Sequence, residues 1–304
     1  MDARGSDQPD DRRTPRSVLV TGATSGIGLA TALLLAGRGW QVVGTARSRA
    51  KADELLRVAA AQGVRVEAVV MDLADAASCE AAVAEAAERT GGGPHALVGN
   101  AGIPLSGAVC DLPDERVREV LEVNVLGTMR MCRLVLPAMR TRGRGRIVTV
   151  SSAAARIPAP MSGWYTASKH ALSAATHSLR MEVERHGAQV ALVEPGAFAT
   201  PFWDRARADL AHPDLGADPA GYARSAALFS RVQRLRGGPE PVARTIARAV
   251  EAARPRRRYT VGVDARLGIA AQALTPLWLS DRIKRGLYGP GPAPTALPAL
   301  KEGR

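Results

Sequence analysis

Seven short runs rich in valine recur along the chain, and they constrain its fold more than any other feature. They alternate with longer segments of helical periodicity, such as 76–90, 114–140 and 164–186. The runs alternate only weakly between polar and apolar residues, as expected of strands that helices cover on both faces. Such an order is typical of an α/β fold with a doubly wound parallel sheet. The predicted strands are 17–21, 41–46, 66–71, 96–99, 146–151, 189–194 and 259–263.

The composition favours one globular domain. The chain has 304 residues, of which 46% are hydrophobic, and this is enough for one sizeable core. We predict a disordered tail over 1–16, a single domain over 17–263 with a substrate lid at about 197–238, and a C-terminal extension over 264–304. The start lacks the apolar stretch of a signal peptide, and no apolar window is long enough for a transmembrane helix. Three widely separated cysteines favour a reducing compartment, so we expect a cytoplasmic location.

A glycine-rich turn follows the first predicted strand and opens a helix. The stretch "TGATSGIG" places Gly22, Gly26 and Gly28 in this turn, together with Ser25 and Ile27. Glycine allows positive φ and a close approach of the backbone to a ligand. Free N–H groups at the start of the next helix suit a pyrophosphate. Such turns also occur for packing alone, but the strand–turn–helix context favours dinucleotide binding.

The second predicted strand ends in "GTARS", where Arg47 follows Ala46. In folds that bind NAD, an acidic residue at this place contacts the ribose hydroxyls. A carboxylate would repel a 2′-phosphate, whereas a guanidinium can bind it through charge-assisted, bidentate hydrogen bonds. We therefore predict a preference for NADP(H) over NAD(H). The alternative is an ordinary surface arginine in an arginine-rich protein.

Tyr165 and Lys169 lie four residues apart in a predicted helix and therefore share one of its faces. A phenol with a pKa of about 10 is a poor base at neutral pH. A neighbouring ammonium is expected to favour the phenolate and to lower that pKa. Ser152 stands thirteen residues before Tyr165, just past a strand, where its hydroxyl can bind and stabilise a substrate oxygen.

These motifs resemble the short-chain dehydrogenase/reductase superfamily, in its oxidoreductase branch rather than the extended branch rich in epimerases. The resemblance covers about 17–263 and implies a Rossmann-like fold. It also includes Asp72 in "MDLAD" and "GNAG" after the fourth predicted strand, where Gly99 replaces the first Asn of the family pattern and Asn100 is retained. The cofactor contacts that it implies are Gly22, Ser25, Gly26, Ile27, Gly28, Arg47, Asp72, Leu73, Asn100, Tyr165, Lys169, Pro195, Gly196 and Thr200.

The resemblance also implies a reaction, in which a nicotinamide exchanges hydride with a carbon that bears an oxygen. Tyr165 exchanges the hydroxyl proton, Ser152 orients the oxygen, and Lys169 binds the nicotinamide ribose. Asn124 in "LEVNVLGT" holds a water in a proton relay through the lysine. The expected catalytic residues are thus Asn124, Ser152, Tyr165 and Lys169. No metal is expected, because the five histidines show no zinc-ligand spacing.

Aromatic residues are scarce, yet seven of the eleven fall between 164 and 229. This clustering predicts an apolar substrate cleft with a lid, although the rings could simply pack the lid down. We expect a bulky carbonyl or alcohol substrate, of steroid, retinoid, acyl or polyketide type. The expected substrate contacts are Ser152, Tyr165, Trp164, Phe198, Phe202 and Trp203.

The net charge of +12 is interpreted as a solvated arginine-rich exterior, since no nucleic-acid-binding motif accompanies it. A short helix with an apolar face is expected in the C-terminal extension, carrying Leu274, Leu277, Trp278 and Ile283. We favour a role in covering the cleft or a partner subunit, with peripheral membrane contact as the alternative. The family resemblance implies a homodimer or homotetramer. A non-catalytic NADP-binding regulator and an epimerase or dehydratase are the rival functions.

Overall fold

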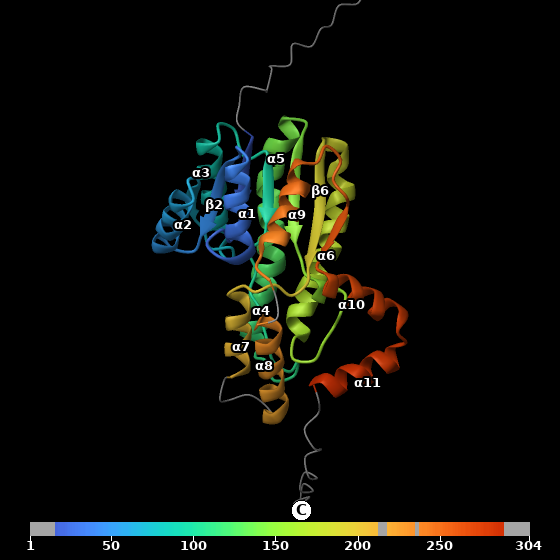
Figure 1. Cartoon of the computed structure of the whole chain (residues 1–304). Helices are drawn as coiled ribbons and strands as arrows, with labels where there is room; N and C mark the ends of the chain where they lie inside the picture. The colour runs from blue at the N-terminus through green and yellow to red at the C-terminus, as the bar shows by residue number, and fades with distance from the viewer. Residues whose placement is uncertain (1–15, 212–217, 235–236, 289–304) are drawn as a thin grey trace, which may run out of the picture.

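A computed structural model describes residues 16–211, 218–234 and 237–288, which form one seven-stranded parallel sheet between helices (Figure 1). The strand order is β3-β2-β1-β4-β5-β6-β7, so the predicted Rossmann-like fold is confirmed. The order reverses direction between β1 and β4, and ligands bind outside the carboxyl ends of the strands at such a point. All seven predicted strands are present: β1 Ser17–Val20, β2 Gln41–Ala46, β3 Glu67–Val70, β4 Ala96–Gly99, β5 Gly145–Val150, β6 Ala188–Pro195 and β7 Arg258–Val261.

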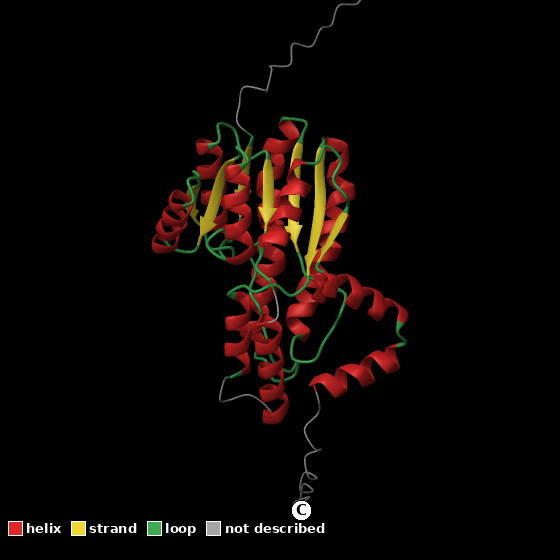
Figure 2. Cartoon of the chain, in the orientation of Figure 1, coloured by secondary structure: helices red, strands yellow, loops and turns green. Residues whose placement is uncertain are grey.

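Helices cover both faces of the sheet because the strand residues alternate between two cores (Figure 2). Val18 and Val20 pack with α1 (Gly26–Gly37), α2 (Arg49–Ala61) and α9 (Glu240–Glu251). Leu19 faces the other way, toward the core formed with α3 (Ala76–Arg89), α5 (Thr128–Thr141) and α6 (Gly163–Val183). This double burial explains why the strands are almost uniformly apolar.

The predicted helix over 114–140 contains a wider turn. α4 (Asp114–Leu121) runs into a π-helical turn at Glu122–Gly127, which continues as α5. Gly127 lies so close to the carbonyl of Leu73 that a Cβ there would be 2.5 Å from the oxygen. Such turns inside helices occur frequently at functional sites, and this one contains Asn124.

Beyond the carboxyl ends of the strands, α7 (Phe202–Leu210) and α8 (Pro219–Arg234) lie beside α4 (Figure 1). They fall within the predicted lid and pack together through Ala206, Leu210, Tyr222 and Phe229. Two polar contacts fix them to the segment after β4: the backbone N–H of Ala108 donates to the Tyr222 hydroxyl at 2.8 Å, and that of Ser106 donates to Asp209 at 3.1 Å. Residues 1–15 of the tail predicted over 1–16 lie outside the described residues, as do 212–217, 235–236 and 289–304. Arg16 itself is described, and its carbonyl accepts from the Gln41 N–H at 3.0 Å.

The C-terminal extension forms two helices, so the expectation of one helix was wrong. α10 (Val263–Leu274) ends before Pro276, and α11 (Leu277–Tyr288) begins after it. Proline disfavours helical geometry in the preceding residue, here Thr275, which adopts an extended conformation. Leu274 and Leu277 thus belong to different helices. No helix in the described ranges combines the length and hydropathy needed to cross a bilayer.

The remaining elements are two short 3₁₀ turns at Ala153–Ala155 and Glu184–His186. The first follows β5 and lies beside α10, because Ala153 packs with Ala265 and Ile269. The extension therefore begins as part of the structure around the carboxyl ends of the sheet.

Candidate active site

The glycine turn after β1 leaves the start of α1 open to a ligand. Gly22 and Gly26 have φ values of +66° and +52°, which favour glycine over residues with a side chain. Ser25 precedes α1, but its side chain makes no capping hydrogen bond, whereas Ser48 and Asp75 cap α2 and α3. No acidic residue lies in the first turn of α1. This helix start fits a phosphate group better than the starts of α2 and α3.

Asn100 and Thr21 hold the turn against β4. The Asn100 side-chain amide donates to the carbonyls of Thr21 at 3.0 Å and Gly22 at 3.4 Å. The Thr21 hydroxyl accepts from the backbone N–H groups of Asn100 and Ala101, both at 3.0 Å. The structure therefore assigns the Asn100 side chain to the support of the turn, and its expected cofactor contact stays a prediction.

Replacing Gly28 with alanine is expected to destabilise the protein by about 1–3 kcal/mol or more. A Cβ at Gly28 would lie 2.1 Å from the Gly22 carbonyl oxygen and 2.5 Å from the Asn100 amide nitrogen, so the turn would have to move. Gly37→Ala, in the last turn of α1, is the control, because its nearest neighbour would be Val64 at 3.7 Å. Thermal and urea unfolding measure both variants. Equal stability of the two would contradict this packing argument.

Three predicted cofactor residues lie at the ends of β2 and β3. Arg47 is exposed and makes no ion pair within the described part of the chain, directly after the buried Ala46. Asp72 is exposed, and its carboxylate accepts from the backbone N–H of Ala74 at 3.0 Å. The Leu73 side chain is buried in the core, and its carbonyl accepts from Arg130. Leu73 therefore presents no side chain for a cofactor.

Tyr165, Lys169 and Ser152 come together where β5 ends and α6 begins. Lys169 is only 4% exposed, and its Nζ lies 5.9 Å from the centre of the Tyr165 ring. This ammonium nitrogen donates to the Val150 carbonyl at 3.1 Å. Ser152 follows β5, where its hydroxyl accepts from the Ala154 N–H at 3.1 Å and lies near enough to Tyr165 to affect the pKa of the phenol. The helical spacing of Tyr165 and Lys169 thus gives the shared face that the sequence predicted.

The pKa values in this group differ from the sequence-based expectation. Burial raises the pKa of the Tyr165 phenol to about 12, and the nearby Ser152 side chain only partly opposes this shift. Burial also lowers the pKa of Lys169 to about 8. The prediction that Lys169 lowers the pKa of Tyr165 was wrong for this structure, because desolvation dominates. Tyr165 is therefore a neutral phenol at neutral pH.

Asn124 is connected to Tyr165 and Lys169 through hydrogen bonds and close packing. Its side-chain oxygen accepts from the Ile103 N–H at 2.8 Å, and its amide donates to the Ser168 hydroxyl at 3.0 Å. Gly102 lies between Asn124 and Lys169, because a Cβ there would be 3.0 Å from the Asn124 oxygen and 3.2 Å from the lysine Nζ. Fully buried Ser168, which sequence reasoning missed, donates in turn to the Tyr165 carbonyl at 2.7 Å.

A second missed residue lies under the segment after β6. The Asp264 carboxylate accepts from the Ala197 N–H at 2.9 Å, and a Cβ on Gly196 would lie 2.5 Å from it. Pro195 ends β6 and is buried. Thr200 packs against the glycine turn, because a Cβ added to Gly26 would lie 3.2 Å from the Thr200 Cβ. Only the position of Asp264 at the start of a helix hinted at this role, since 67 residues separate it from Ala197.

The predicted aromatic residues divide into two groups. The Phe202 ring lies 5.3 Å from Tyr165 and 5.9 Å from Trp203, which in turn lies 5.4 Å from Phe229. The lid is thereby connected to the phenol. Trp164 instead packs against the small cluster around Leu105 and Val120, and Phe198 packs against the main core.

Comparisons with known proteins agree with this arrangement. The short chain dehydrogenase family profile matches residues 16–211. A Streptomyces virginiae protein named as a ketoacyl reductase of the monensin polyketide synthase is 41% identical over 196 residues, covering 64% of this chain and 75% of its own. A Burkholderia phymatum short-chain dehydrogenase/reductase, crystallised with NAD, matches with a TM-score of 0.76 and 25% identity, covering 93% of this chain and 99% of its own.

A variant of actinorhodin polyketide ketoreductase, crystallised with NADPH, gives a TM-score of 0.72 at 31% identity, covering 83% of this chain and 97% of its own. The fold, the open turn after β1 and these similarities agree. The chain belongs to the short-chain dehydrogenase/reductase family, whose enzymes depend on NAD(P), and it is an oxidoreductase of this kind.

Proposed function

We propose that this enzyme is an NADP(H)-dependent reductase of bulky apolar carbonyl compounds, with Tyr165 as the general acid. The observation that supports it best is the meeting of a neutral phenol, the Ser152 hydroxyl and the buried Lys169 ammonium beside the lid. Both hydroxyls can bind one carbonyl oxygen, and the phenol can donate the proton that converts it to an alcohol.

Each residue of the site would have its own role in carbonyl reduction. A bound nicotinamide supplies the hydride. The start of α1, Arg47 and Lys169 would bind and orient the dinucleotide. Ser152 would orient the carbonyl, and Tyr165 would give its proton to the oxygen. Asn124 would help to return a proton to Tyr165 through Lys169, because Gly102 leaves room between the Asn124 and Lys169 side chains.

The protonation state of Tyr165 supports the direction of reduction. A phenol with a pKa of about 12 carries its proton at neutral pH and can donate it. Alcohol oxidation needs the phenolate instead and would speed up as pH rises. The positive charge of Arg47, which pairs with no carboxylate in the described part of the chain, supports NADP(H) at the adenosine ribose.

The substrate class is supported by Phe202 and the aromatic residues behind it in the lid. An apolar wall next to the proton donor suits a bulky ketone. A polyketide-type acyl substrate is the second candidate, favoured by the 41% identity to a polyketide synthase reductase. Trp164 and Phe198 stay proposed contacts at the edge of the cleft.

A substrate screen tests this function directly. The enzyme is mixed with NADPH or NADH and with steroids, retinoids, aliphatic ketones and β-keto thioesters, while absorbance of the reduced nicotinamide is followed. We expect consumption of NADPH with apolar ketones or β-keto thioesters. Tight NADPH binding with no turnover of any carbonyl would instead support the regulatory alternative.

Replacing Arg47 with aspartate is expected to invert the cofactor preference. Loss of the charge-assisted bond, about 1.5–3 kcal/mol, should weaken NADPH binding by about tenfold or more. NADH affinity should change little or improve. Arg65→Asp is the control, because Arg65 is exposed before β3 at the opposite end of the sheet. Fluorescence titration measures both cofactors, and unchanged NADPH affinity in the Arg47 variant would remove this assignment.

The proposal includes a homodimer or homotetramer in the cytoplasm. A groove of about 540 Å³ between α5 and α6 supports contact through these helices, and Met129, Leu136 and Leu179 are among its lining residues. Sedimentation equilibrium tests this assembly.

A further inference from the structure

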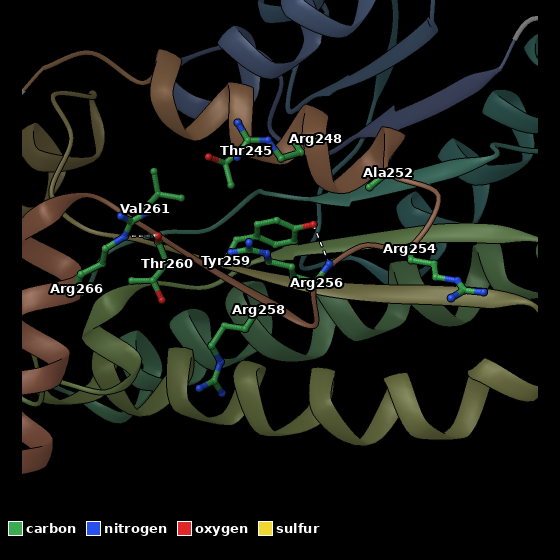
Figure 3. Close-up of a pocket in the computed structure, with 10 residues that line it drawn as sticks. All are labelled: Thr245, Arg248, Ala252, Arg254, Arg256, Arg258, Tyr259, Thr260, Val261 and Arg266. Atoms are coloured by element: carbon green, nitrogen blue, oxygen red, sulfur yellow. Dashed lines mark hydrogen bonds between the residues drawn. The ribbon is translucent and has the colours of Figure 1, made fainter.

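An arginine-lined cavity of about 580 Å³ lies along the outer side of β7 (Figure 3). Its side chains come from α9, from the segment that joins α9 to β7, from β7 itself and from α10. Five of them are arginines: Arg248, Arg254, Arg256, Arg258 and Arg266. The volume falls within the range of about 300–1,000 Å³ that is typical of small-molecule sites.

Positive charge dominates this cavity because no acidic side chain lines it. Of the five arginines, only Arg258 approaches a carboxylate in the described structure, with its Nε 3.6 Å from the buried Glu194. Even with Glu194 counted as ionised, five positive charges less one leave four uncompensated. Arg258 also helps, after burial, to lower the pKa of His177.

Hydrogen bonds fix parts of the cavity wall. The Tyr259 hydroxyl accepts from the backbone N–H of Arg256 at 2.9 Å, and this bond holds the segment that leads into β7. Arg266 donates from its Nε to the Thr260 carbonyl at 3.4 Å. Thr245 and Thr260 also line the cavity, and their hydroxyls donate within the protein, to the Pro241 carbonyl at 2.9 Å and to the Glu194 carboxylate at 3.4 Å. The guanidinium groups are therefore the main hydrogen-bond donors left for a ligand, on a wall that hydrogen bonds support.

A second copy of this edge does not suit the cavity. β7 is an edge strand, and pairing it with another β7 would bring two sets of arginines together without any acidic partner. The cavity is also separate from the glycine turn, because β4, β5 and β6 lie between β7 and β1 in the sheet.

We propose that this cavity binds a small anion with two or three linked phosphate groups. Four uncompensated charges exceed what one phosphate neutralises but match a di- or triphosphate. Guanidinium groups bind phosphate oxygens through bidentate, charge-assisted hydrogen bonds. Nothing in the proposed reaction uses these arginines, so the site is an addition to the reductase function.

Titration calorimetry with tripolyphosphate tests the site, using full-length protein saturated with NADP⁺ so that the glycine turn is occupied. We expect saturable binding of one anion per chain that weakens as salt is added. A parallel titration with ATP distinguishes a site for inorganic polyphosphate from a site for a nucleotide, since both ligands carry linked phosphate groups. Equal affinity indicates recognition of the phosphates alone, and tighter binding of ATP indicates that the nucleoside also contributes.

Neighbouring arginines provide matched controls. Arg256→Gln and Arg248→Gln should each weaken binding by about tenfold, the loss expected for one charge-assisted bond. Arg257→Gln and Arg244→Gln change exposed arginines on the same segments that do not line the cavity, and binding should stay as in the unchanged protein. Circular dichroism and thermal unfolding confirm that each variant folds.

Two results would overturn the proposal, and neither depends on the reductase function. One is the lack of saturable binding in the folded, unchanged protein. The other is an equal loss in the Arg256 and Arg257 variants, which would show that only the diffuse positive charge of the surface attracts the anion.

Discussion

Tyr165→Phe will abolish carbonyl turnover while cofactor binding stays close to that of the unchanged enzyme. The substitution removes only the hydroxyl, and the ring can keep its contact with Phe202 at 5.3 Å. A positioned general acid contributes about 10²–10⁴-fold to a rate, so kcat should fall at least about a hundredfold. Steady-state kinetics measure kcat, and fluorescence titration measures NADPH affinity.

Tyr259→Phe is the matched control, because it removes a phenol hydroxyl that accepts from the Arg256 backbone N–H and has no role in the proposed reaction. It should keep its turnover. If the Tyr165→Phe enzyme retained more than about a tenth of the kcat, the assignment would be wrong, and another group or water would have to donate the proton. Comparable losses in both variants would point to a stability effect instead, which thermal unfolding would reveal.

The sequence was sufficient to predict the sheet because its signal is local. Each strand is a short apolar run, and helices had to cover both sides of it. The meeting of Tyr165 with Lys169 was equally predictable, since residues four apart share a helix face. Ser152 and the glycine turn follow strands, and the carboxyl ends of parallel strands meet at one edge of the sheet.

Features that depend on distant parts of the chain were not predictable in this way. The π-helical turn at Asn124 accompanies the close packing of Gly127 against the Leu73 carbonyl. The raised pKa of Tyr165 arises from burial, to which Phe202 of the lid contributes a neighbouring ring. Asp264 bonds to a backbone N–H that is 67 residues away in the sequence. Only the break at Pro276 had a local signal that should have been used.

Reduction should become slower above about pH 8 because Lys169 loses its proton there. Its pKa is lowered to about 8 by burial, and the charged form is the one proposed to bind the ribose and restore the proton. Tyr165 keeps its proton over the same interval, since its pKa is about 12. The kcat/KM for NADPH should be flat below this point and fall toward tenfold per pH unit above it.

Lys169→Arg provides the test of that assignment. A guanidinium stays charged throughout this pH range, so the decline should move to higher pH or vanish, even if the larger group lowers the overall rate. Kinetics at constant ionic strength, between about pH 6 and 10, measure the profile. A decline that stays at the same pH in the variant would belong to a different group.

The pH dependence of protein stability gives a second, independent measure of the pKa of Lys169. Its pKa is about 8 in the folded protein and 10.5 by default, so between these values the unfolded chain binds more protons than the native one. The lysine therefore makes the free energy of unfolding rise with pH in this window, by up to about 1.4 kcal/mol per pH unit. Lys169→Met lacks this titration, so the stability of the unchanged protein relative to that variant should increase between about pH 8 and 10 in urea unfolding. A difference that does not change with pH would mean that Lys169 keeps an ordinary pKa, and the decline in reduction rate would then need another cause.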